Sequence, residues 1–121
     1  MSVIAFAEQR NGAFKKSAFE TVAEAKRLAD KLGTQAVAVV IGNNVAGIAS
    51  ELGKYGASKV YVVENAALEN YSTEGYTQAL TEAVKKENAS VILMGATAMG
   101  KDLAPRTAAR LGAGIASDVT A

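Results

Sequence analysis

The sequence of 121 residues contains no cysteine and no histidine. Without cysteine, disulfide frameworks, thiolate nucleophiles and cysteine-based metal sites are excluded. Without histidine, the chain lacks the commonest general base and metal ligand, and a Ser–His–Asp mechanism is excluded as well. We therefore expect neither a catalytic residue nor a metal site in this chain.

An excess of charge of one sign is also lacking. Thirteen basic residues stand against twelve acidic ones, and only 6% of the residues are aromatic. Such a chain lacks the basic field and the stacking side chains of a nucleic-acid-binding protein. The opening sequence MSVIAFAEQR has no positive n-region and an apolar stretch no longer than a strand, so it predicts neither a signal peptide nor a membrane span. We expect a cytoplasmic protein, or one in an equivalent reducing compartment such as the mitochondrial matrix.

Short runs of β-branched residues alternate with longer helical stretches, and half of all residues are apolar. The alternation is typical of βαβ units, and the length suits one domain. We predict a single α/β domain over residues 1–121, a Rossmann-like sandwich of three layers with a parallel sheet in the middle. The predicted strands are 3–7, 36–41, 59–64, 91–94 and 115–120. The predicted helices are one that follows Ser17 and stops at Gly33, and those over 45–52, 73–87 and 103–111.

Short-range signals mark several boundaries. Arg10-Asn11-Gly12 is a turn signal that predicts a small hairpin. Ser17 and Glu20 have the spacing of a capping box at the start of the first long helix. That helix is expected to stop at a glycine, Gly33. Because the last predicted strand reaches almost to the C-terminus without a polar tail, we interpret the chain as a fragment of a longer protein.

The loop 95–102 reads Gly-Ala-Thr-Ala-Met-Gly-Lys-Asp and follows a predicted strand. It resembles a phosphate-binding loop except at its last position, where Ser or Thr is needed to coordinate magnesium. Asp102 places a negative charge there instead. The alternative is that Asp102 caps the following helix, with Pro105 in the first turn, where its missing N–H costs nothing. We favour the cap over an NTPase site.

The loop 42–47, Gly-Asn-Asn-Val-Ala-Gly, also joins a strand to a helix. Its exposed amides would suit an anion or a ribose hydroxyl, but a tight turn that uses Gly and Asn is the favoured interpretation. A third glycine-rich stretch, 112–117, resembles a dinucleotide fingerprint. It follows a helix and precedes a strand, which is the wrong context, so we discard it.

Three further features have competing interpretations. Arg106 and Arg110 share a helix face and would suit a phosphate or an acidic partner, although a solvated face is favoured. Glu8 ends the first strand, where a catalytic carboxylate would lie, but we predict a solvated charge. We predict that the tyrosines lie at the edge of the core with their hydroxyls in water, rather than forming a partner surface. They are Tyr55, Tyr61, Tyr71 and Tyr76.

Three segments, in order, carry a family resemblance: VIAFAEQRNGAFKKSAFETVAEAKRLAD, ELGKYGASKVYVVEN and GATAMGKDLAPRTAARLGAGIASDVTA. Together they resemble the N-terminal domain of the electron-transfer flavoprotein α subunit, over essentially the whole chain. The resemblance implies a fold like that of the adenine nucleotide α-hydrolases and universal stress proteins. It also implies a heterodimer with a β subunit that holds AMP, and an FAD held by a C-terminal domain that this chain lacks.

In that family, FAD collects electrons from dehydrogenases, such as the acyl-CoA dehydrogenases of fatty-acid β-oxidation, and passes them to a quinone oxidoreductase or another acceptor. No residue here matches the family's flavin-binding motifs, so we expect a non-enzymatic structural and docking domain without a cofactor of its own. The rival hypothesis is a free-standing AMP- or ATP-binding module like a universal stress protein. The resemblance places a degenerate nucleotide site at Gly42, Gly95, Thr97, Gly100 and Lys101.

Overall fold

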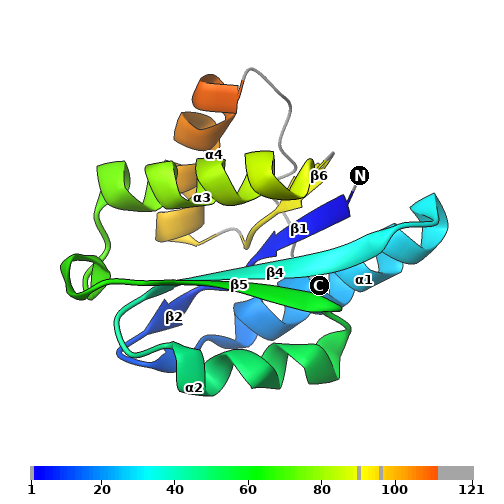
Figure 1. Ribbon diagram of the computed structural model, residues 1–121, viewed down its shortest axis with the longest axis horizontal. Coiled ribbons are helices and arrows are strands. Elements are labelled where there is room, and N and C mark those ends of the chain that lie inside the picture. The colour runs from blue at the N-terminus through cyan, green and yellow to red at the C-terminus, as the bar shows by residue number, and fades with distance from the viewer. Residues whose placement is uncertain (1, 90, 96, 112–121) are drawn as a thin grey trace.

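A four-stranded parallel sheet forms the centre of the molecule (Figure 1). The structure is a computed structural model and describes residues 2–89, 91–95 and 97–111. In these residues the sheet has the strand order β5-β4-β1-β6. Its strands are β1 (Ser2–Phe6), β4 (Gln35–Gly42), β5 (Lys59–Glu64) and β6 (Val91–Leu93).

Helices cover both faces of this sheet, which confirms the predicted three-layer sandwich. In Figure 1, α3 and α4 lie on one side of the sheet and α1 and α2 on the other. Alternate residues of β4 divide between two cores, because neighbouring side chains on a strand point to opposite faces. Val37 and Val39 pack with α3 and α4, whereas Ala38 and Val40 pack with α1. The helical elements are α1 (Lys16–Leu32), α2 (Ala46–Ala49), η1 (Ser50–Tyr55), η2 (Ala66–Leu68), α3 (Thr73–Glu87) and α4 (Ala98–Leu111).

The small hairpin is confirmed. It consists of β2 (Gln9–Arg10) and β3 (Ala13–Phe14), which pair in antiparallel fashion. The two residues between them, Asn11 and Gly12, have φ values of 54° and 81°. Both values lie in the left-handed region that the two-residue turns of hairpins require, which explains the Asn-Gly sequence.

The first long helix begins earlier than predicted. The predicted capping box of Ser17 and Glu20 is wrong, because α1 starts at Lys16, with Lys15 as a cap residue that makes no side-chain cap bond. The Lys15 N–H donates to the Glu8 carbonyl (3.2 Å), so closure of the hairpin sets where the helix begins. At its other end the helix stops at Gly33 (φ 69°) as expected.

Two other helices also differ from expectation. The predicted helix 45–52 is a short α-helix followed by a 3-10 helix, and this pair ends at Gly56, whose φ is 115°. The last helix begins at Ala98 rather than at residue 103, so Pro105 lies inside it and not in its first turn. By contrast, α3 has the predicted bounds. The predicted strand 115–120 lies outside the described residues.

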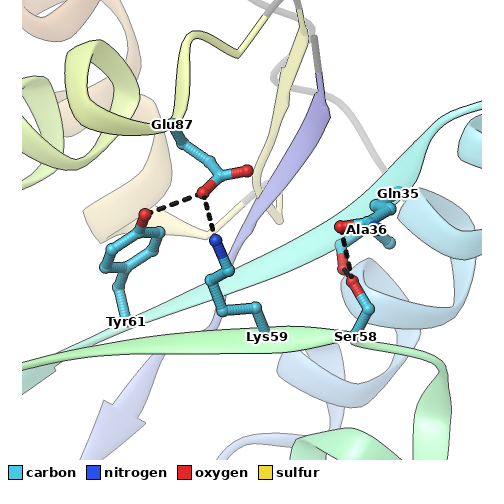
Figure 2. A network of polar contacts seen from close by, with 6 residues as sticks. All are labelled: Gln35, Ala36, Ser58, Lys59, Tyr61 and Glu87. Atoms are coloured by element: carbon cyan, nitrogen blue, oxygen red, sulfur yellow. Dashed lines mark hydrogen bonds and ion pairs between the residues drawn. The ribbon is translucent and has the colours of Figure 1, made fainter.

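A carboxylate anchors the C-terminal end of α3 to β5 (Figure 2). Glu87 accepts hydrogen bonds from the Tyr61 hydroxyl (2.7 Å) and the Lys59 ammonium (3.0 Å). These donors hold the pKa of Glu87 below its usual value, the Tyr61 hydrogen bond being the largest cause. The anchor is therefore made by the ionised carboxylate.

Candidate functional site

The loops that follow β1, β4, β5 and β6 meet at the carboxyl edge of the sheet, because all four strands run in the same direction. In open parallel sheets this edge is where ligands bind. The described candidate residues, Gly42, Gly95, Thr97, Gly100 and Lys101, lie on two of these loops and on the start of α4.

The loop after β6 is closed by its own groups. The Thr97 hydroxyl accepts a hydrogen bond from the Gly100 N–H (3.0 Å), and the Lys101 N–H donates to the Thr97 carbonyl (2.8 Å). A Cβ atom built on Gly100 would lie less than 3.0 Å from the Gly95 carbonyl oxygen. The first turn of α4 therefore rests directly on the Gly95 backbone, and only glycine allows this approach.

Glu8 is the acidic neighbour of this loop. Its carboxylate accepts a hydrogen bond from the Thr97 hydroxyl (2.5 Å) and pairs with the Lys15 ammonium (3.1 Å). The prediction that Glu8 is a solvated strand-end charge is wrong, because the residue is only 6% exposed. The contact with Thr97 spans 89 positions in the sequence, so no local pattern indicated it.

These groups do not fit a bound phosphate. A phosphate loop offers free backbone N–H groups and positive charge to the anion. Here the Gly100 N–H is already bonded to Thr97, and the Glu8 carboxylate lies against the Thr97 hydroxyl. Lys101 is exposed on α4. The Gly100 N–H and the Thr97 hydroxyl are thus both engaged within the chain, and the charge next to Thr97 is a carboxylate paired with Lys15.

Asp102 does not cap α4, so that prediction is wrong. The cap is Thr97, and Asp102 lies within the helix, where its carboxylate accepts hydrogen bonds from Tyr71 Oη (2.6 Å) and Thr73 Oγ1 (2.9 Å). Arg106 Nε also donates to it (3.2 Å). Sequence reasoning missed these partners because Tyr71 and Thr73 precede Asp102 by 31 and 29 positions.

The two partners shift each other's pKa values in opposite directions. The Tyr71 and Thr73 hydroxyls hold the pKa of Asp102 below its usual value. Burial, followed by the hydrogen bond to Asp102, raises the pKa of Tyr71 to about 12. Asp102 is therefore ionised and Tyr71 is neutral at physiological pH, and the pair joins the segment before α3 to α4.

The loop after β4 is also occupied by a carboxylate of the same chain. Glu64 Oε1, at the end of β5, accepts hydrogen bonds from the Val45 N–H (2.9 Å) and the Ala46 N–H (3.3 Å). These are amides that an anion or a ribose would have used. Sequence reasoning missed Glu64, although an acid at the end of the strand beside β4 is the signal that could have revealed it. The favoured turn is supported by Asn44, whose φ is 56°.

Gly42 makes room for the side chain of Gln9. A Cβ at this position would lie less than 3.0 Å from Gln9 Nε2. The Gln9 amide donates through Nε2 to the Ile41 carbonyl (3.0 Å) and accepts through Oε1 from the Gly12 N–H (3.0 Å). The missing Cβ of Gly42 thus allows the hydrogen bond between Gln9 of the hairpin and Ile41 of β4.

Two open grooves lie beside this contact, and both are lined by Gln9, Asn11 and Glu69. Their volumes are about 370 Å³ and 280 Å³. The first also contains Asn43, whose side-chain amide donates to Glu69 (3.3 Å). The lining is rich in amide groups, which suit hydrogen bonding to a neutral polar surface.

The other charged and aromatic candidates bond mostly within the protein. Arg106 and Arg110 are exposed, as the favoured interpretation of a solvated helix face predicted. They form ion pairs with Asp102 and Glu74, respectively. The prediction of hydroxyls in water is wrong for three of the four tyrosines. Their hydroxyls donate to Glu87, Asp102 and the Leu68 carbonyl, and they belong to Tyr61, Tyr71 and Tyr76.

The described part of the chain holds neither a candidate metal cluster nor a candidate membrane span. No group of three or more His, Cys, Asp or Glu residues is arranged there to hold a metal ion. None of the described helices has both the length and the apolar character to cross a bilayer.

Known structures of similar fold include universal stress proteins. The universal stress protein of Archaeoglobus fulgidus superposes with a TM-score of 0.63 at 11% identity, covering 97% of both chains. A universal stress protein in complex with cAMP superposes with a TM-score of 0.62 at 14% identity, covering 98% of both chains. At such low identity these likenesses concern the fold alone, and they confirm the fold class expected from the sequence.

Sequence relatives include α subunits of electron transfer flavoproteins. The α subunit of Thermoanaerobacterium thermosaccharolyticum is 50% identical over 115 residues, which is 95% of this chain and 35% of that protein. The acryloyl-CoA reductase electron transfer subunit beta of Anaerotignum propionicum is 44% identical over 95% of this chain and 31% of its own length. The α subunit of Bacillus subtilis is 40% identical over 96% of this chain and 35% of its own length. The chain thus spans about a third of the length of these relatives.

The family model of the electron transfer flavoprotein domain matches residues 3–121. The resemblance drawn from the three sequence segments is thereby confirmed, and the chain belongs to the electron transfer flavoprotein domain family.

Proposed function

We propose that this chain is a structural and docking domain of an electron-transfer flavoprotein α subunit, and that the redox chemistry takes place on an FAD held elsewhere in the complex. The observation that carries the proposal is the match to α subunits at up to 50% identity among the relatives named above, together with a carboxyl edge whose loops bond to one another.

The chemistry of the edge supports a framework role. Its most buried acid, Glu8, pairs with Lys15 and Thr97, and Glu64 is used to hold the start of α2. Glu8 and Glu64 accept hydrogen bonds from the Thr97 hydroxyl and the Val45 N–H, which stabilises the loops. These donors are therefore not available to a phosphate. The FAD supplies the electron-transfer chemistry when bound, while a domain of this kind supplies orientation and an interface.

The partner in this proposal is a β subunit, and the complex accepts electrons from dehydrogenases such as the acyl-CoA dehydrogenases. A quinone oxidoreductase or another acceptor then takes the electrons. The relative from Anaerotignum propionicum supports a link to acyl-CoA chemistry, because its name describes an electron transfer subunit of acryloyl-CoA reductase.

Two measurements on the purified chain test the proposal. We expect a colourless protein that takes up no FAD when flavin fluorescence is followed during a titration. We also expect a complex with a β subunit of the same family in size-exclusion chromatography. Stoichiometric FAD at micromolar or better affinity, or failure to bind any such β subunit, would contradict it.

A second candidate function is nucleotide binding, favoured by the fold of the universal stress protein that was solved with cAMP. Ligand at a hundred times its dissociation constant stabilises a protein by about 2.7 kcal/mol, which is a shift of several degrees in a domain of this size. We expect no shift with millimolar AMP or ATP. A shift that requires magnesium and disappears in Lys101→Ala would instead indicate an NTPase site.

A further inference from the structure

The tip of the hairpin carries a chemically reactive pair of residues. Asn11 is one of six asparagines in the chain and is the one that is followed by glycine. In an Asn-Gly pair the glycine has no Cβ, so its backbone nitrogen can approach the asparagine side chain closely. Asn11 is exposed to solvent, and both residues have positive φ values in the turn.

The attacking nitrogen of this pair is held by a neighbouring side chain. The Gly12 N–H donates to Gln9 Oε1 (3.0 Å), and Gln9 is only 6% exposed. Gln9 is itself fixed, because its Nε2 donates to the Ile41 carbonyl (3.0 Å). The absence of a Cβ at Gly42 is what leaves room for this arrangement.

We propose that Asn11 is a site of spontaneous deamidation, and that the hydrogen bond from Gly12 to Gln9 sets the rate. When the bond opens, the Gly12 N–H loses its proton to solvent base, and the nitrogen attacks the side-chain carbonyl carbon of Asn11. Ammonia leaves, and a five-membered succinimide forms. Water then opens either carbonyl of the ring, which gives aspartate or isoaspartate at position 11, and no oxidant or cofactor takes part.

Either product changes the two grooves beside the hairpin. A carboxylate replaces the neutral amide of Asn11 in linings that already contain Glu69, so both grooves become more acidic. Isoaspartate also adds one methylene to the main chain. A two-residue turn that pairs Arg10 with Ala13 cannot absorb this extra length without losing its register.

The test follows deamidation of the purified chain in alkaline and in mildly acidic buffer, by peptide mapping with separate detection of aspartate and isoaspartate. We expect Asn11 to react faster than Asn65 and Asn70, which are also exposed but precede larger residues. We also expect the alkaline rate to be higher, because attack requires a deprotonated amide. Equal rates at the three positions would overturn the assignment of Asn11.

Variants test the role of Gln9 separately. Gln9→Met keeps the side-chain length but removes the acceptor, and should speed the reaction at Asn11 about fivefold, the factor that corresponds to one ordinary hydrogen bond. Gly42→Ala should act in the same direction by displacing the Gln9 amide. The matched control is Gly47→Ala, whose Cβ meets nothing within 4 Å and which should leave the rate unchanged.

A synthetic peptide covering residues 7–15 gives a reference that does not depend on folding of the variants. The peptide should react faster than the folded chain, since it has no fixed Gln9 side chain. If the wild-type chain reacts as fast as the peptide, or if Gln9→Met and Gly42→Ala both fold and react at the wild-type rate, the role of Gln9 is refuted.

Discussion

Replacing Gly100 by alanine should destabilise the chain, although alanine is the better helix former. The new Cβ would lie less than 3.0 Å from the Gly95 carbonyl oxygen, and a backbone atom cannot move aside as a flexible side chain can. Overpacking of this kind costs about 1–3 kcal/mol. Disturbing the cap formed by Thr97 adds about 1 kcal/mol, and the helix propensity of alanine offsets about 1 kcal/mol. The net loss in the free energy of unfolding is therefore about 1–3 kcal/mol.

Thermal unfolding followed by circular dichroism measures this loss. At about 4 °C per kcal/mol, the midpoint of Gly100→Ala should fall by about 4–12 °C. Gly47→Ala is the matched control, because its Cβ meets nothing within 4 Å in α2 and its midpoint should stay the same or rise. If Gly100→Ala unfolds at the wild-type temperature, the close approach of α4 to Gly95 is not present in the protein.

Three further outcomes follow from the hydrogen-bond networks. Asp102→Asn should lower the pKa of Tyr71 from about 12 towards its ordinary 10.0, measured by ultraviolet titration of tyrosinate; an unchanged pKa would leave burial as its whole cause. Because the pKa of Glu87 is lower in the folded chain, its stabilising effect is present above the unfolded pKa near 4.5 and is lost as the pH falls through the folded value. Tyr61→Phe should therefore lower the thermal midpoint at neutral pH and much less in acid, and an equal loss at both pH values would contradict this. Thr97→Ala should cost about 1 kcal/mol in urea unfolding, whereas Thr97→Ser should retain most of the cap, and equal losses in the two variants would argue against a role for the hydroxyl.

Much of the fold could be predicted because it depends on local signals. The bounds of α3 and the end of α1 at Gly33 follow from hydrophobic spacing and from a glycine in the left-handed region. The hairpin follows from the Asn-Gly pair. The starts of α1 and α4 were predicted wrongly, because the residue that precedes each helix is bonded to Glu8, a contact that no local pattern indicates.

The candidate site was harder to predict than the fold. The sequence indicated that Gly95, Thr97 and Gly100 lie on a loop that resembles a phosphate-binding loop, with Asp102 as the acid that departs from the pattern. In the structure the acid bonded to that loop is Glu8, and Asp102 is bonded to Tyr71. A motif is a local pattern, whereas the carboxylate that acts on this one lies between β1 and β2, far away in the sequence.

By itself the sequence determined the order of the elements, the class of the fold and the family, because each rests on spacing or residue identity along the chain. Only the tertiary structure decided which groups satisfy the hydrogen-bond donors at the carboxyl edge. Glu8 reaches Thr97 across 89 positions, and Glu64 reaches Val45 across 19. The physical reason is that parallel strands bring their carboxyl ends together in space while the crossover helices keep them apart in sequence.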